Sequence, residues 1–259
     1  MRYFIIQTHL NVGDSSCIAG DEANHIIKVL RKRQKDIIGF FDKRGFEYKA
    51  VITKILKKEV YITIIDKILS QTESNLKITI GMALLKEKKI ERLIKTLTEL
   101  GIVSFMPFIS KCCVVKPDKE KIKSRVIRWK KIADEALKQC KRSRVPKIYP
   151  PVSFDEILNG SETESTKKII CYEEEKDFFN KTGHNLSETN NWFIIIGPEG
   201  GFTEEEILLA KSKGFISYGL GSRILRSETA AVAVVAIIQF LYGDMGRTSE
   251  KNFRSSQAV

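Results

Sequence analysis

Cysteine and histidine are scarce in this chain of 259 residues, and they are scattered. The five cysteines are Cys17, Cys112, Cys113, Cys140 and Cys171, without a CxxC pair, and the chain has only three histidines. An odd number of cysteines in this spacing argues against a disulfide framework, and so few ligands argue against a zinc site. We therefore expect a reduced chain that binds no metal.

Long apolar runs are also lacking. The longest one, Ala230 to Leu241, is interrupted by Gln239 and is too short to span a bilayer. The chain does not open with a charged leader followed by an apolar segment. Hydrophobic residues make up 42% of the sequence, as in a soluble globular protein, so we expect a cytoplasmic location and no membrane partner.

Positive charge, in contrast, is abundant and uneven. The formal net charge is +12, and the excess lies in three clusters: Lys28 to Lys35, Lys86 to Lys95 and Lys116 to Lys147. A single basic cluster is as often a solvated surface as a binding site. Three separate clusters favour a nucleic acid as the partner.

The hydrophobic pattern changes after about residue 70. Residues 1–70 predict a small β-rich domain, 71–75 a polar linker, and 76–243 an alternation of strands and helices that indicates a mostly parallel α/β sheet. The tail 244–259 has almost no apolar residues, and we expect it to be disordered. In the first domain we expect a helix, Asp21 to Arg33, and the strands Tyr3 to Gln7, Asp36 to Phe41, Glu47 to Leu56 and Glu59 to Ile68.

Periodicity predicts the elements of the second domain in the same way. Apolar runs predict strands at Lys77 to Leu85, Ile102 to Ile109, Lys167 to Tyr172 and Trp192 to Ile196. Apolar positions at helical spacing predict helices at Glu87 to Leu100, Lys119 to Lys141 and Ala230 to Tyr242. The last helix is apolar on nearly all sides, so it lies either in the core of one subunit or in the seam of a dimer.

Two glycine-containing loops each follow a short apolar run. The first, GPEGGF at 197–202, precedes Thr203, which opens a helix with a capping-box pattern. The second, LGSRILRSETA at 220–230, follows Phe215 to Tyr218 and leads into the last helix, with Ser227 expected as its N-cap. Ligands of α/β sheets bind in loops at the carboxyl ends of strands, so we expect one ligand cleft between these two loops.

The first loop is not a phosphate site of a known type, because it has neither GxxxxGK[ST] nor GxGxxG. Gly197, Gly200 and Gly201 let backbone N–H groups approach a ligand closely, and Glu199 disfavours phosphate. A neutral or cationic ligand, such as a nucleoside that carries a sulfonium, suits such an acidic loop. The alternative is a plain structural turn.

The second loop places Arg223 and Arg226 near Glu228. One interpretation is a local ion pair at a helix start. The other is functional: an arginine holds a phosphate or a uracil carbonyl, and Glu228 orients it or takes a proton. The sequence leaves both interpretations open.

Motifs in several places resemble one protein family. The strings GPEGGF and LGSRILRSETA are similar to the signature of the RsmE-type 16S ribosomal RNA uridine N3-methyltransferases, members of the SPOUT superfamily of knotted methyltransferases. His25 to Arg31 resembles the family's H-x-x-x-VLR element, and Glu99 to Gly101 followed by Pro107 resembles its ELG…P segment. Trp129 to Pro146 resembles its W…EA..Q..R…P segment, so the matches run from about residue 2 to 242.

This resemblance implies methylation of N3 of a specific uridine in 16S ribosomal RNA, within the small ribosomal subunit, with S-adenosylmethionine as the methyl donor. It also implies a PUA-like RNA-binding domain, an α/β domain with a deep trefoil knot, a homodimer, and the cofactor bound in the knot. The family's cofactor contacts fall on Cys171, Tyr172, Ile196, Gly197, Pro198, Glu199, Gly200, Gly201, Leu220, Gly221, Ile224, Leu225, Arg226 and Thr229.

Methylation at N3 needs an unpaired base, because N3 lies on the Watson–Crick edge. We expect Arg226 to stabilise the uracil anion or hold the adjacent phosphate, and Glu228 to orient Arg226 or, like water, to accept the proton. Residues of both domains are expected to grip the RNA, mostly through phosphates: Arg2, Arg31, Lys32, Arg33, Arg125, Arg128, Lys138, Gln139, Arg142 and Arg144.

Three positions depart from the family pattern: Lys35 replaces a glycine, Thr96 a lysine, and Lys111 to Cys113 an arginine-serine pair. All lie outside the two loops, so they affect RNA contact and not methyl transfer. Two rival functions remain. A ribose 2′-O-methyltransferase usually carries S-L-N-V-S where this chain has Arg226 to Ala230, and a non-catalytic RNA-binding assembly factor would not need intact glycine loops.

Overall fold

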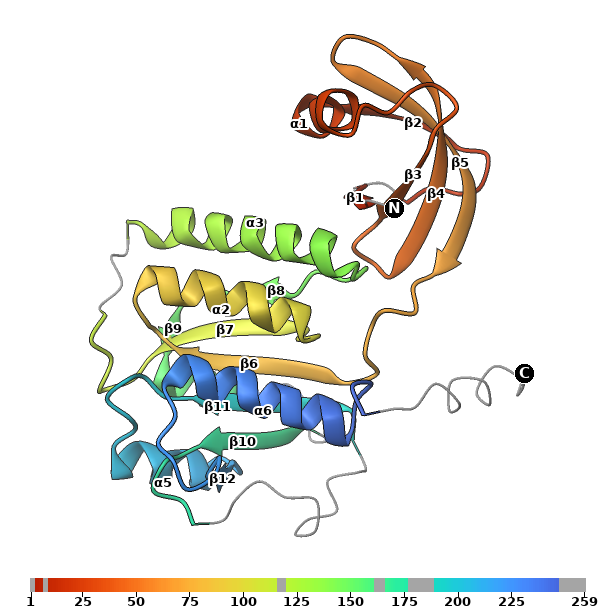
Figure 1. Ribbon diagram of the computed structural model, residues 1–259. Helices are drawn as coiled ribbons and strands as arrows, with labels where there is room; N and C mark the ends of the chain where they lie inside the picture. Colours follow the sequence, from red (N-terminus) through yellow and green to blue (C-terminus); the bar gives the residue numbers. More distant parts are fainter. Residues whose placement is uncertain (1–2, 7–8, 116–119, 161–165, 177–188, 247–259) are drawn as a thin grey trace. The chain divides into compact units, whose positions relative to one another are not determined.

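The chain divides into two compact units in the computed structural model, which describes residues 3–6, 9–115, 120–160, 166–176 and 189–246 (Figure 1). The first unit comprises residues 1–73 and 134–145, and the second comprises residues 74–133 and 146–259. Arg2 and nearly all of the tail expected to be disordered lie outside the described residues. No helix in the described ranges is long and apolar enough to cross a membrane.

The first unit is built on a five-stranded sheet in the order β1-β3-β4-β5-β2. Its strands are β1 (Tyr3–Ile5), β2 (Ser15–Ala19), β3 (Ile37–Phe41), β4 (Phe46–Ile55) and β5 (Glu59–Leu69). β1 runs parallel to β3, and the other pairs are antiparallel. Alternate side chains of β4 and β5 are buried, among them Tyr48, Ile52 and Ile62, as the two-residue period of a half-buried sheet requires. The predicted β-rich character of this part of the chain is confirmed.

The helical segment of this unit is shorter than expected. α1 (Gly20–Asn24) continues into a π-helix, η1 (His25–Val29), so the predicted helix from Asp21 to Arg33 extends too far. Arg31 has a φ of 49°, a left-handed conformation that a helix does not accommodate. β2 was not predicted, because only Ile18 among its five residues is buried and the segment lacks an apolar alternation.

The second unit contains a sheet in the order β12-β10-β11-β6-β7-β8, and every pairing along it is parallel. The strands are β6 (Lys77–Ala83), β7 (Ser104–Ile109), β8 (Lys147–Ile148), β9 (Val152–Ser153), β10 (Lys167–Cys171), β11 (Asn191–Ile196) and β12 (Ile216–Tyr218), with β9 paired to β7. The predicted parallel α/β sheet is confirmed. β8 and β9 were not predicted, because two residues are too few to show a period.

Helices cover both faces of this second sheet (Figure 1). On one face α2 (Glu87–Glu99) packs against α6 (Ser227–Leu241), and α6 contacts β6 and β11. On the other face α4 (Phe154–Asn159) and α5 (Glu204–Ser212) pack with Phe193 and Ile195 of β11. Trp192 points the opposite way and stacks on Tyr242 just after α6, with 5.3 Å between ring centroids. β11 is therefore apolar along nearly its whole length because both of its faces are covered.

Two helices of this region test the sequence predictions differently. α3 (Ile122–Cys140) confirms the expected long helix and buries Trp129, Ala133 and Leu137. α4 was missed, although Ser153 and Glu156 form a capping box at its start. This capping box was a local signal that the sequence analysis could have used.

Candidate functional site

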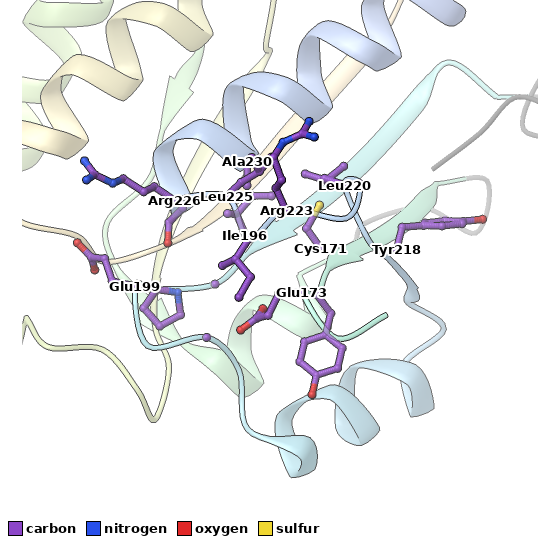
Figure 2. Close-up of a pocket in the computed structure, with 17 residues that line it drawn as sticks. Cys171, Glu173, Ile196, Glu199, Tyr218, Leu220, Arg223, Leu225, Arg226 and Ala230 are labelled. Carbon is purple, nitrogen blue, oxygen red and sulfur yellow. The ribbon is translucent and has the colours of Figure 1, made fainter. Parts of the chain in front are cut away.

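Three parallel strands end side by side at one edge of the second sheet. Cys171 at the end of β10 is in register with Ile196 at the end of β11 and with Tyr218 at the end of β12. A pocket of about 230 Å³ lies beyond these strand ends, lined by the loops that follow them (Figure 2). Every residue expected to contact the cofactor lines this pocket except Gly200 and Thr229.

The first loop turns sharply, and two of its glycines are needed for the turn. A Cβ on Gly197 would lie 2.9 Å from the ring of Phe202. Gly201 has a φ of +72°, which residues with a side chain rarely adopt, and its N–H donates to the Pro198 carbonyl at 3.0 Å. A Cβ on Gly201 would also collide with the carboxylate of Glu173, so this glycine leaves room for Glu173 in the pocket wall.

Gly200 packs against a different part of the chain. A Cβ at this position would lie 3.2 Å from the Cβ of Cys112, in the segment after β7, and Gly200 does not line the pocket. The structure therefore assigns this glycine to packing and not to the pocket wall. The loop ends at Thr203, which forms the expected capping box with Glu206 at the start of α5.

The second loop enters α6 one residue earlier than expected. Arg226 occupies the N-cap position without a side-chain cap hydrogen bond, and Ser227 is already helical, so the predicted N-cap at Ser227 is wrong. Ser227 and Ala230 are three residues apart on one helical face, and both line the pocket. Thr229 lies on another face of α6 and does not line the pocket, although it was expected to contact the cofactor.

Sequence reasoning also missed Glu173 and Tyr218 as lining residues and gave Arg223 no contact with a cofactor. Tyr218 could have been found, because it ends the apolar run that precedes the second loop. Glu173 stands two residues after the end of β10, in a third segment that lines the pocket.

A lysine from α2 connects the two loops. The Lys89 Nζ donates to Glu199 Oε1 of the first loop at 2.9 Å and lies 3.3 Å from Glu228 Oε1 at the start of α6. The hydrogen bond to Glu199 raises the pKa of Lys89; burial opposes this shift, and the hydrogen bond to Glu228 adds to it. The sequence analysis did not single out Lys89, which it treated only as one member of a basic cluster. Lys89 lies 110 positions before Glu199, so no local pattern connects the two residues.

The pKa of Glu228 lies below its usual range. Burial raises this pKa, but a hydrogen bond from the Glu228 backbone, the bond and charge of Lys89, and the charge of Arg226 outweigh burial. Position in the first turn of α6 also favours the charged carboxylate, because the positive end of the helix dipole lies there. A carboxylate with a lowered pKa is a weak proton acceptor.

Both arginines of the second loop line the pocket, and their side chains point in different directions (Figure 2). Within the described ranges neither Arg223 nor Arg226 forms a side-chain hydrogen bond or an ion pair, whereas Glu228 pairs with Lys89. The first interpretation of the Arg–Glu motif, a local ion pair between Glu228 and an arginine of the same loop, is therefore not observed among the described side chains. The arginines contribute positive charge to the pocket that no ion pair among the described residues holds.

The strand end at β10 contributes neutral walls. Burial raises the pKa of the Cys171 thiol to about 12, and Cys171 is 9% exposed. Burial is also the main cause that raises the pKa of Tyr172 to about 12, followed by the hydrogen bond from its hydroxyl to Glu174 at 2.9 Å. Both side chains are uncharged at neutral pH and suit an uncharged part of a ligand. Among the residues that the structure describes, no group of His, Cys, Asp and Glu side chains is placed to hold a metal ion.

The described residues that were expected to grip RNA fall into two groups. Arg31, Arg33, Gln139 and Arg144 are exposed. The remaining five described residues form ion pairs: Lys32 with Asp36 at 3.8 Å, Arg125 with Glu87 at 3.8 Å, Arg128 with Glu91 at 2.7 Å, Lys138 with Glu22 at 2.6 Å and Arg142 with Glu73 at 2.8 Å. These pairs reduce the positive charge that is free to meet phosphates.

Arg142 differs from the rest because it is only 4% exposed. Its guanidinium donates twice to Glu73 Oε2, at 2.8 and 3.2 Å. The other oxygen of Glu73 accepts from the backbone N–H groups of Ser143 and Arg144 at 2.8 and 2.9 Å. The structure therefore shows Arg142 as the buried member of a hydrogen-bonded pair with the partly buried Glu73 inside the first unit.

Comparison with known proteins adds the identity of the fold. Residues 72–239 match the RNA methyltransferase domain family, and residues 18–65 match the RNA methyltransferase PUA domain family. The fold and the pocket thus define an RNA methyltransferase with a PUA domain. The ribosomal RNA small subunit methyltransferase E of Bacillus subtilis is 34% identical over 246 residues, which cover 92% of this chain and 96% of that protein. This chain belongs to the ribosomal RNA small subunit methyltransferase E family.

Solved structures agree with this assignment. The structure of a ribosomal RNA small subunit methyltransferase E from Neisseria gonorrhoeae bound to S-adenosyl methionine has a TM-score of 0.85 and 30% identity, and covers 95% of this chain and 99% of that chain. A methyltransferase from Legionella pneumophila in complex with the same cofactor has a TM-score of 0.83 and 30% identity, with 94% and 98% covered. The predicted family and fold class are confirmed, whereas the trefoil knot and the homodimer stay predictions.

Proposed function

We propose that this protein transfers the methyl group of S-adenosylmethionine to N3 of a uridine in small-subunit ribosomal RNA. The observation that carries the proposal is the pocket at the carboxyl ends of β10, β11 and β12, which gathers both glycine-containing loops and two free arginines in one place. The family's members are named for small-subunit ribosomal RNA, and the Neisseria gonorrhoeae relative binds this methyl donor.

The pocket residues fit such a cofactor. Cys171, Tyr172 and Ile196 offer uncharged walls for a nucleoside, and the first loop brings backbone groups close without side chains at Gly197 and Gly201. Acidic side chains in the lining, Glu173 and Glu199, suit the positive sulfonium and ammonium groups, and Arg223 suits the carboxylate. S-adenosylmethionine supplies an activated methyl group when bound; the protein supplies orientation and charge.

Arg226 carries the part of the chemistry that depends on charge. Methylation at N3 removes a proton from the uracil ring and leaves negative charge on its oxygens. A fixed guanidinium beside that charge stabilises the transition state more than the ground state. Arg226 lines the pocket, is exposed at the start of α6 and is free of a carboxylate partner within the described ranges. The Glu228 carboxylate is paired with Lys89 at 3.3 Å, so we assign the N3 proton to solvent and not to Glu228.

The finer assignments belong to the same proposal. The substrate is the RNA within the small ribosomal subunit, the enzyme works in the cytoplasm as a homodimer, and its α/β domain carries the trefoil knot. Phe240 on α6 is 63% exposed although its helix is apolar on most sides, and this supports a second copy packed against α6. Arg31, Arg33 and Arg144 are exposed and support phosphate contacts.

Two measurements test the proposal. Titration calorimetry of the purified protein with S-adenosylmethionine should show binding, and the absence of binding at millimolar cofactor would exclude the enzyme. Nucleoside mass spectrometry of small-subunit RNA from a strain without the gene should show one N3-methyluridine lost. Loss of a ribose-methylated nucleoside instead would assign the chain to the rival 2′-O-methyltransferases.

A further inference from the structure

Two carboxylates near Arg226 would attract its guanidinium: Glu199 in the pocket lining and Glu228 at the start of α6, beside the pocket. The Arg226 guanidinium is exposed and has no hydrogen bond or ion pair within the described residues. Glu228 stands two positions later at the start of α6, and Glu199 lines the same pocket from the first loop. Arginine forms strong, paired hydrogen bonds with carboxylates. A carboxylate near Arg226 that is not held elsewhere would therefore compete with an anionic substrate for the Arg226 guanidinium.

Lys89 forms ion pairs with both of these carboxylates. Its Nζ lies 2.9 Å from Glu199 Oε1, and it lies 3.3 Å from Oε1 and 3.4 Å from Oε2 of Glu228. The lysine stands in the first turn of α2, next to Ile90, which is fully buried. The position of Lys89 is therefore set by a packed helix that belongs to neither loop, and its compact ammonium group can serve two carboxylates at once.

We propose that Lys89 is a positioning residue, which holds Glu199 and Glu228 so that the Arg226 guanidinium stays free for the anionic RNA acceptor. This inference rests on the methyl transfer proposed above and adds the residue that keeps its arginine available. Without Lys89, the Glu228 carboxylate turns to Arg226, and the RNA must displace it before methyl transfer. In this proposal Glu228 has no catalytic role of its own, and Lys89 keeps its carboxylate away from Arg226.

The decisive experiment is a double-mutant cycle of Lys89→Met, Glu228→Gln and the double variant. For each protein, kcat and KM are measured with unmodified small ribosomal subunits, and the affinity for S-adenosylmethionine is measured by calorimetry. Lys89→Arg tests whether a conservative cation suffices. Lys213→Met is the control, because Lys213 is an exposed lysine outside the three basic clusters.

We expect Lys89→Met to lower kcat/KM for the subunits about tenfold, which corresponds to about 1.4 kcal/mol. The double variant should return to within about twofold of the wild type, because a glutamine no longer competes for Arg226. Lys89→Arg and Lys213→Met should keep the wild-type value. Affinity of the cofactor-free protein for the subunits should follow the same order, which provides a readout that does not depend on turnover.

Each other outcome overturns the inference. Unchanged kcat/KM in Lys89→Met shows that the lysine does not protect Arg226. Equal losses in Lys89→Met and the double variant show that Lys89 contacts the RNA itself or only supports the fold. Loss of transfer in Glu228→Gln alone makes Glu228 the proton acceptor. These outcomes can be distinguished from a failure of the proposed function, in which the wild type itself would neither bind S-adenosylmethionine nor methylate the subunits.

Discussion

Positive charge is arranged differently on the basic surface and in the pocket. On the surface, Lys32, Arg125, Arg128 and Lys138 each lie 3.8 Å or less from a carboxylate. In the pocket, Arg223 and Arg226 have no such partner among the described residues; Glu199 in the lining and Glu228, two positions after Arg226, both pair with Lys89. The net charge of +12 therefore overstates the positive charge that is available to RNA phosphates. An arginine or lysine is available where the nearby carboxylates are already paired with another cation.

The largest effect is expected where a basic residue is buried with its partner. Arg142→Ala should lower the free energy of unfolding by about 3 kcal/mol, because it leaves the Glu73 carboxylate, which is only 14% exposed, without its cation. Urea denaturation measures the change, and Arg144→Ala, an exposed neighbour, should shift it by less than about 0.5 kcal/mol. If Arg142→Ala weakens RNA binding at unchanged stability, Arg142 belongs to the RNA surface after all.

The next effect concerns the free arginine of the pocket. Arg226→Ala should reduce methyl transfer by about 100-fold to 1,000-fold, because one fixed donor to a developing negative charge contributes about 2.7–4 kcal/mol. Affinity for S-adenosylmethionine should stay close to that of the wild type. The surface arginine Arg128, paired with Glu91 at 2.7 Å, is the control, and Arg128→Ala should leave the chemical step unchanged. Normal turnover in Arg226→Ala would remove this arginine from the mechanism.

A smaller effect is expected from the first loop. Gly201→Ala should weaken S-adenosylmethionine about tenfold, since the new Cβ meets Glu173 in the pocket wall and the backbone has a φ of +72°. Gly214→Ala is the matched control, because Gly214 has a similar φ of +82° and open space around it, away from the pocket. Calorimetry compares the two variants. Equal affinities would mean that the first loop is only a turn.

The smallest effect is expected from pH. The pKa of Glu228 is lowered in the folded protein, so its pair with Lys89 contributes stability above the ordinary glutamate value of 4.5 and loses it as pH falls through the lowered value. The pKa of Lys89 is raised, so its contribution persists below 10.5 and disappears as pH rises beyond the raised value. Tm should therefore not respond to this pair between about pH 6 and 9. A change in that window that Glu228→Gln abolishes would contradict these shifts.

The sequence was most informative where the signal is local. The glycine loop after β11, the capping box at Thr203 and the apolar runs of β10 and β11 depend on neighbours a few residues apart, and the structure places them as expected. The order of short motifs also led to the correct family. The register of α6 was off by one residue, because Ser227 is a good N-cap by residue type and the chain instead enters the helix at Arg226.

By itself, then, the sequence determined the alternation of strands and helices, the two loops that end up in one pocket, and the excess of positive charge. Only the tertiary structure decided which charges meet. Lys89 and Glu199 are 110 positions apart, and they pair only because α2 packs beside α6 at the end of the sheet where the first loop emerges. An ion pair requires two side chains within about 4 Å, and a periodic pattern specifies the face of a helix but not its distance from a distant loop.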